Sequence, residues 1–266
     1  MHKYWHVIKI GFSNTLVYRV NYFFRGTFSL IPLLATIYVW RTVYHGQTEN
    51  VGGYTLAGMI SYYLLVTIVD TLTAVAEDDW QIAADIKDGN ISQFLLKPIN
   101  YMIYRLCLFF SGRVIFTAVS IIPVGIFIVC WRRYFVGPTD GLALGCFFLA
   151  TALTALLQFF ISFTMALLSF WLLEVSTMIF MLFAIEYIAG GHLFPLNILP
   201  PALAHALNYT PFPYQLYFPV AIYLGQVKGA ALAQGLVIEC GWVLFFYGLA
   251  CLVWKRGLRK YSAAGG

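Results

Sequence analysis

The sequence predicts an all-α integral membrane protein with six transmembrane helices. Of its 266 residues, 61% are hydrophobic, 18% are aromatic and only 10% carry a formal charge, whereas soluble domains average about 45–50% apolar and about 25% charged residues. Mean hydropathy is +0.79. A soluble fold of this length cannot bury so much apolar surface. The composition therefore excludes a disordered chain, a nucleic-acid-binding module and an ordinary cytosolic enzyme.

Long apolar stretches locate the six helices, since a helix needs about 20 mostly apolar residues to cross a bilayer. The expected spans cover residues 26–44, 54–75, 101–131, 141–173, 175–189 and 230–254. The third and fourth stretches are long enough to tilt or to project beyond the membrane. We expect residues 1–266 to form a single transmembrane domain.

The distribution of Lys and Arg predicts the orientation of these spans. With the N-terminus in the cytoplasm, eleven of the sixteen basic residues lie in inner segments or at the inner end of a span, and four lie in outer segments or at the outer end of a span; Arg113 lies inside the third span. Basic residues accumulate in cytoplasmic loops of membrane proteins. We therefore expect both termini on the cytoplasmic side.

The segment 1–25 has the pattern of a helix lying in the membrane interface. Apolar residues recur every three to four positions, and basic residues fall between them, notably Lys3, Lys9 and Arg19. Such a helix rests its apolar face on membrane lipids and its basic groups near the headgroups. The alternative is a frayed N-terminal tail.

The inner segment 77–100 is the most charged part of the chain. Acidic residues suit a helix start, Ile82 and Ile86 lie one turn apart, and Gly89 favours a helix stop. A hydrophobic return, Phe94 to Leu96, ends at Lys97-Pro98. Because a solvated connector needs no such apolar residues, the pattern favours a docking element over a simple linker.

The outer segment 190–228 contains six of the ten prolines and is nevertheless strongly apolar and aromatic. An exposed loop does not need that apolar surface, and a simple span does not carry that many prolines. Broken helices that dip into the outer leaflet against protein satisfy both facts. Gly190-Gly191 would be the hinge that follows the fifth span.

Five charged residues are expected inside or beside the spans, where charges are costly and often functional. Arg41 lies near the outer end of the first span, where its side chain can extend to the interface. The others are Asp70, Arg113, Glu186 and Glu239. Asp70 and Arg113 are placed to pair. The three acidic residues suggest either a proton or ion relay or, as their scattered positions favour, interhelical or intersubunit pairing.

Known catalytic and nucleotide-binding patterns are missing from the sequence. It contains no GxxxxGK[ST] loop, HExxH or GxSxG motif, and its five cysteines lack zinc-site spacing. We therefore expect neither a catalytic residue, a metal site nor a cofactor in this chain, and no nucleic-acid partner.

Three segments together resemble the membrane-spanning permease subunit of bacterial ABC-2 type exporters. They are DIKDGNISQFLLKPIN (85–100), GGHLFPLNILP (190–200) and YTPFPYQLYFPVAIYLG (209–225), and the C-terminal WKRGLRKYSAAGG is similar in style. The resemblance implies a location in the bacterial inner membrane, a second permease subunit, identical or related, and two cytosolic ATPase subunits that bind ATP and Mg.

The resemblance also implies roles for particular residues. The segment 77–100 would contain the coupling helix seated on an ATPase, with Asp79, Ile82, Asp85, Ile86, Gly89, Phe94, Leu95, Leu96 and Lys97 as its coupling residues. The substrate route and its outer gate would involve Glu186, Gly190, Gly191, Phe194, Pro195, Phe212 and Tyr214.

The outer aromatic residues suggest an amphipathic or lipid-like cargo, and a peptide or saccharide remains open. Two other functions also remain open. One is an ion-coupled secondary transporter that uses Asp70, Glu186 and Glu239; the other is a membrane-embedded enzyme or scaffold.

Overall fold

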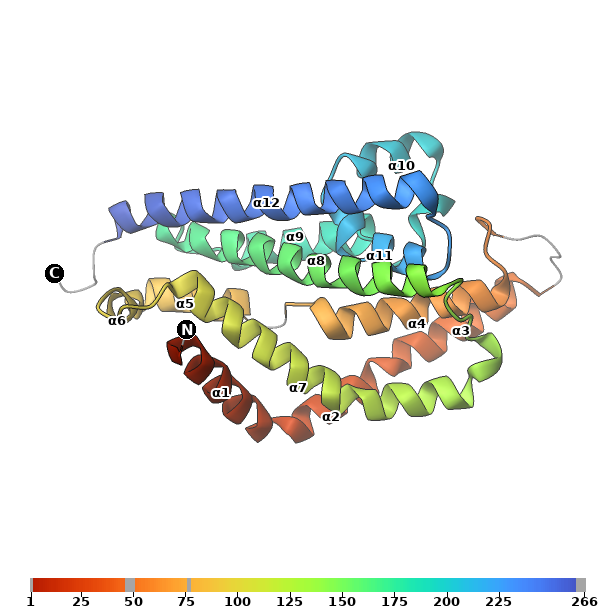
Figure 1. Cartoon of the computed structure of the whole chain (residues 1–266), viewed down its shortest axis with the longest axis horizontal. Coiled ribbons are helices and arrows are strands. Elements are labelled where there is room, and N and C mark those ends of the chain that lie inside the picture. Colours follow the sequence, from red (N-terminus) through yellow and green to blue (C-terminus); the bar gives the residue numbers. More distant parts are fainter. Residues whose placement is uncertain (1, 46–50, 76–77, 262–266) are drawn as a thin grey trace.

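The computed structural model describes residues 2–45, 51–75 and 78–261, and within these ranges the chain is helical with no β-strand (Figure 1). The structure does not describe the side chains of His2, Asp78 and Asp79, so the predicted coupling residue Asp79 falls outside the described side chains.

Five helical stretches are long and apolar enough to cross a membrane. They are Arg19–Val43 (α2, Arg19–Phe28, with α3, Leu30–Val43), α4 (Leu56–Thr73), α7 (Tyr101–Cys130), Gly141–Phe170 (α8, Gly141–Ala166, with the 3-10 turn η2, Leu167–Phe170) and α12 (Gly229–Lys260). The expected fifth span is α9 (Ser176–Ala189), which is apolar but has only 14 residues. An all-α, multi-pass membrane protein is therefore confirmed, while a sixth span stays a prediction.

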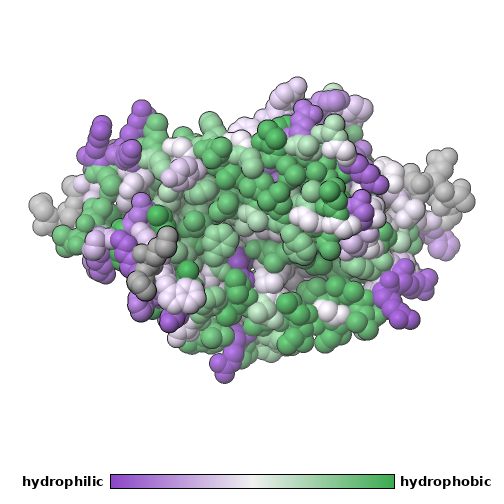
Figure 2. All heavy atoms as spheres, in the orientation of Figure 1, coloured by the Kyte–Doolittle hydropathy of each residue, from purple (hydrophilic) through white to green (hydrophobic). Residues whose placement is uncertain are grey.

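The surface of the molecule agrees with a membrane location. Hydrophilic residues gather toward the two ends of the long axis, and hydrophobic residues cover most of the part between them (Figure 2). Many large hydrophobic side chains are exposed, including Ile121, Val129, Phe148 and Phe180, each more than half exposed. Such a surface is stable against lipid and unstable against water.

Side-chain caps set the start of three long helices. Thr55 accepts a hydrogen bond from the Gly58 amide, Asn100 accepts one from Ile103, and Asp140 accepts one from Ala143. Each cap satisfies an amide that has no partner within its helix.

The N-terminal segment forms two helices rather than one. α1 (His2–Val17) packs along α7, and the chain bends sharply near Tyr18 before α2 (Figure 1). A Cβ at Gly11 would lie 2.8 Å from Ser111 Cβ, so glycine permits this close approach. The predicted single helix over 1–25 is thus divided, because α2 continues toward α3 as part of a span.

Four segments meet at the end of the bundle that we predict to be cytoplasmic, called the inner end below. α5 (Asp78–Lys87) and the short α6 (Ile91–Leu95) lie at the end where α1 begins and α12 ends (Figure 1). Between α5 and α6, Gly89 has φ +76°, a left-handed conformation that favours glycine. The predicted helix stop at Gly89 is therefore confirmed.

The outer segment is a series of short helices at the opposite end (Figure 1). They are η3 (Leu196–Ile198), α10 (Pro201–Asn208), η4 (Phe212–Gln215) and α11 (Tyr217–Tyr223). α11 packs against α8 and α4, and α12 packs along α8. The helices are broken as predicted, and their depth in a membrane stays a prediction.

Candidate functional site

A buried ion pair fastens α5 to the beginning of α7. The Asp85 carboxylate accepts hydrogen bonds from Arg105 Nη2 and from Tyr101 Oη, the latter at 2.7 Å. Arg105 Nε donates to Tyr101 Oη at 2.9 Å, and its Nη1 donates to the Gln81 side chain at 3.1 Å. Arg105 is therefore held on several sides, which compensates for burying its charge.

The apolar face of α5 points into the chain. Ile82 and Ile86 are 1% and 5% exposed and belong to the main hydrophobic core, where α5 packs against α8 and η2. The expected docking surface of these two isoleucines is thus turned inward, because the core of this same chain satisfies their hydrophobic surface.

The return after α5 does present apolar side chains outward. Leu95 is 51% exposed and Leu96 is 88% exposed. Phe94 is half-buried against the rings of Tyr101 and Tyr104, with Lys97 Nζ 5.5 Å from its ring centroid. Of the predicted coupling residues, Leu95 and Leu96 therefore offer the exposed apolar contact.

Two contacts tie this inner end to α12. The Tyr101 ring stacks on Trp254 with centroids 5.2 Å apart, and Ser92 Oγ lies 3.0 Å from Tyr261 Oη. α5, α6, α7 and α12 consequently form one connected body at this end.

A cavity of about 890 Å³ lies between α2, α3, α4, α8 and α9. Its walls mix apolar side chains with polar ones. The polar and charged residues that line it include Arg25, Ser29, Tyr63, Thr67, Asp70, Thr71, Arg113, Gln158, Ser162, Glu186, Tyr187 and His192. Such a mixed cavity suits a ligand that carries both apolar and polar groups.

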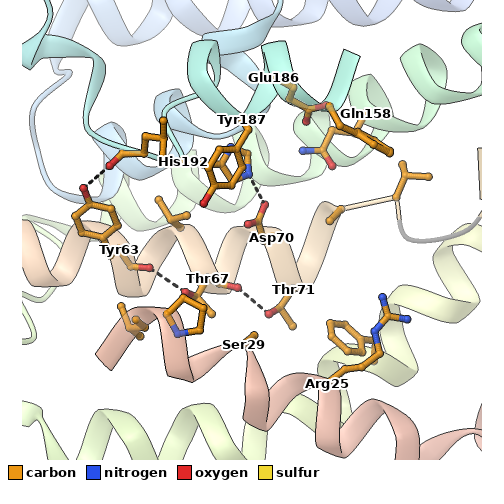
Figure 3. Close-up of a pocket in the computed structure, with 18 of the residues that line it drawn as sticks. Arg25, Ser29, Tyr63, Thr67, Asp70, Thr71, Gln158, Glu186, Tyr187 and His192 are labelled. Carbon is orange, nitrogen blue, oxygen red and sulfur yellow. Dashed lines mark hydrogen bonds and ion pairs between the residues drawn. The ribbon is translucent and has the colours of Figure 1, made fainter. Parts of the chain in front are cut away.

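Asp70 and His192 form the polar centre of this cavity. His192 Nε2 lies 3.2 Å from Asp70 Oδ1, and the Tyr187 ring stacks on the imidazole with centroids 4.9 Å apart (Figure 3). His192 lies outside the long helices; burial lowers its pKa, but Asp70 and then Glu186 raise it, with a net rise above the ordinary value. This favours an imidazolium paired with the Asp70 carboxylate.

The structure pairs Asp70 with His192, and the expected pairing of Asp70 with Arg113 stays a prediction. Arg113 lines the same cavity, and its guanidinium lies 5.2 Å from the ring centroid of Phe116. The partner of Asp70 is His192 of the outer segment, which lies 122 positions away in the sequence and was therefore not expected.

The three acidic residues of the expected relay do not come together. Asp70 and Glu186 line the cavity, but Glu239 is fully buried elsewhere, 3.1 Å from Thr154 Oγ1. The same Thr154 hydroxyl lies 2.8 Å from the Tyr214 carbonyl, so its single hydrogen is shared between the two acceptors. Glu239 thus belongs to a contact between α8, α12 and η4.

The predicted hinge at Gly190-Gly191 is fastened to α4. Tyr62 Oη donates to the Gly191 carbonyl at 2.6 Å, and Tyr63 Oη donates to the Leu193 carbonyl at 2.6 Å. Gly191 has φ +97°, and a Cβ there would lie 2.7 Å from Tyr62 Oη, so this position requires glycine.

The remaining predicted gate residues surround this junction but do not line the cavity. Pro195 and Tyr214 are buried, whereas Phe194 and Phe212 are half-buried. Sequence reasoning missed His192, Tyr62, Tyr63 and Arg105 as structural partners. A signal existed for Arg105, which lies one helical turn from Tyr101 at the start of a span.

Comparison with known proteins gives one family. A family model described as ABC-2 family transporter protein matches residues 30–265. No curated protein is significantly similar to the chain.

Proposed function

The chain belongs to the ABC-2 transporter family, and from this premise we propose that it is the permease subunit of an ATP-driven exporter. Two cytosolic ATPase subunits would bind and hydrolyse ATP with Mg, and this chain would supply no catalytic residue. A second permease, identical or related, would complete the transmembrane unit. The assembly would lie in a bacterial inner membrane with both termini of this chain in the cytoplasm.

The inner end of the bundle supports a docking role for α5 and α6. Leu95 and Leu96 present apolar side chains outward beside Lys97. An exposed apolar cluster beside charged residues is a suitable contact for a partner protein. We assign these residues to the ATPase contact and assign Ile82 and Ile86 to holding α5 on the transmembrane body.

Movement of the ATPase would reach the spans through fixed contacts. The Asp85–Arg105 pair joins α5 to α7, and the Tyr101–Trp254 stack joins α7 to α12. A movement of the ATPase against α5 and α6 would therefore displace α7 and α12 together with them as a rigid body.

The cavity between α3, α4 and α9 supports a substrate route. Its cargo would be amphipathic or lipid-like, or a peptide or saccharide, and would leave the cytoplasm or the inner leaflet outward. Glu186 lies on the cavity wall, and the Gly190-Gly191 junction would act as the outer gate, with Phe194, Pro195, Phe212 and Tyr214 supporting it.

An ion-coupled secondary transporter is the alternative. The meeting of Asp70, His192 and Glu186 in one cavity favours it. The separate burial of Glu239 argues against the three-residue relay.

Leu96 is the position at which the ATPase contact can be tested. A charge introduced at Ile86 would be buried in the core of the chain, whereas Leu96 is 88% exposed, so we expect its replacement to leave the fold intact. We expect Leu96→Asp to reduce co-purification of the proposed cytosolic ATPase subunit by about tenfold or more, as loss of an interface anchor does.

Leu96→Met is the matched control and should retain the ATPase, because it preserves volume and apolarity. Transport in vesicles should stop on ATP depletion and continue when the proton gradient is dissipated. Normal ATPase binding by Leu96→Asp would contradict the contact, and transport by this chain without any ATPase would contradict the function.

A further inference from the structure

We propose that the cavity binds the cationic amine or onium group of an amphiphilic cargo at the wall formed by α4, α9 and His192. The inference rests on the proposed function for its transport role, but the binding site stands on the geometry of this chain. Its ligand class is an organic cation with apolar substituents.

Glu186 supplies the first reason. It lies on α9 within the cavity wall, and its carboxylate forms no side-chain hydrogen bond or close ion pair among the described residues, although the His192 imidazole is a neighbouring charge. In Figure 3 it is drawn on the same side of the cavity as Tyr187 and His192. A carboxylate within a membrane protein is costly unless a cation or a proton compensates it.

The neighbouring charges leave an excess of negative charge at this wall. Asp70 is already paired with His192 at 3.2 Å, so a protonated imidazole neutralises one carboxylate and leaves the second. A bound cation would neutralise this second carboxylate, Glu186.

Ser162 on α8 is an independent sign of a missing ligand. Its side chain is 7% exposed and lines the cavity, and its Oγ has no hydrogen-bond partner among the described residues. Buried hydroxyls normally have partners. A polar group of a bound molecule would satisfy this one.

Aromatic side chains complete the recognition of an onium group. Trp40, Tyr63 and Tyr187 line the same cavity, with the Trp40 and Tyr63 centroids 6.3 Å apart. Aromatic faces attract cations, and Trp does so most strongly. A bare metal ion would need oxygen ligands in place of these rings.

The two arginines of the cavity come from helices outside this wall. Arg25 comes from α2 and Arg113 from α7, and Figure 3 shows Arg25 across the cavity from Glu186. The cavity is therefore polarised, and a cationic group is drawn toward α9. Its volume of about 890 Å³ is in the range of pockets for drug-sized molecules, about 300–1,000 Å³.

The test compares two probes of the same shape and opposite charge. Tetraphenylphosphonium and tetraphenylborate are titrated onto the purified full chain in lipid nanodiscs, and binding to protein-free nanodiscs is subtracted. We expect saturable binding of the phosphonium, at least tenfold weaker binding of the borate, and at least tenfold loss of phosphonium affinity in Glu186→Gln.

Glu174→Gln and Glu239→Gln are the matched controls, since neither carboxyl lines the cavity, and both should bind like the parent chain. Trp40→Leu gives a second variant and should weaken phosphonium binding severalfold while size-exclusion profiles stay unchanged. Equal binding of both probes, or an unchanged affinity in Glu186→Gln, would overturn the site.

No ATPase is present in this assay, so its result tests the cation-binding site independently of the proposed permease function. Loss of the ATPase contact leaves the binding result readable, and absence of phosphonium binding leaves the permease role intact.

Discussion

Arg105 shows how a single side chain connects the inner helix to the transmembrane body. It is 3% exposed, and its guanidinium contacts Asp85, Tyr101 and Gln81. The desolvation of a buried charge is offset only when partners surround it in this way. Asp85, predicted to face a partner protein, is instead occupied within the chain.

We predict that Arg105→Ala destabilises the protein by about 3–5 kcal/mol, the usual cost of leaving one member of a buried pair without its partner. Thermal unfolding in detergent measures this as a lower Tm. Arg133→Ala, at an exposed arginine of the η1 turn (Arg132–Tyr134), is the control and should change Tm little. An equal Tm for both variants would show that the Asp85–Arg105 pair does not stabilise the protein.

At the scale of the helices, the outer segment is held by side chains that reach its backbone. Thr154 of α8 binds the Tyr214 carbonyl, and one turn later Gln158 donates to the Gln215 carbonyl at 3.2 Å. Two adjacent carbonyls of η4 are therefore bound by one face of α8. The sequence predicted the broken helices from their prolines but gave no sign of this attachment.

Thr154→Val should lower stability by about 1–3 kcal/mol, because it leaves the Tyr214 carbonyl and the buried Glu239 without a partner. Thr164→Val in the same helix is the matched control, since its hydroxyl bonds only the Phe160 carbonyl one turn back. Denaturation of both variants in detergent measures the difference. A loss in Thr164→Val as large as that in Thr154→Val would refute the attachment.

At the scale of the whole molecule, the two ends differ in what they carry. α5, α6, the start of α1 and the end of α12 share one end, and η1 with the outer segment lies toward the other (Figure 1). The Lys and Arg distribution predicts that the first end lies in the cytoplasm.

Labelling of single cysteines tests this orientation. In a chain whose five natural cysteines are replaced by serine, Gly137→Cys should react with an impermeant maleimide in intact cells, and Asp88→Cys should react only after permeabilisation. Gly137 is exposed with open space around its Cα, and Asp88 is an exposed residue after α5. The reverse pattern would invert the predicted topology.

The sequence by itself determined the membrane class, four of the long helices with nearly their observed bounds, the Gly89 stop and the broken outer segment. These features depend on local composition, apolar length and backbone preferences, which neighbouring residues encode. The bend near Tyr18 escaped it, because hydrophobic length alone does not show where a helix ends.

Only the tertiary structure decided which charged and polar groups meet. Asp70 and His192 are 122 positions apart, and Thr154 and Glu239 are 85 positions apart. Periodicity identifies an apolar face such as that of Ile82 and Ile86, but not whether the chain itself or a partner covers it. That choice depends on how distant helices pack, which is why the cavity and its carboxylates emerge from the fold and not from any local pattern.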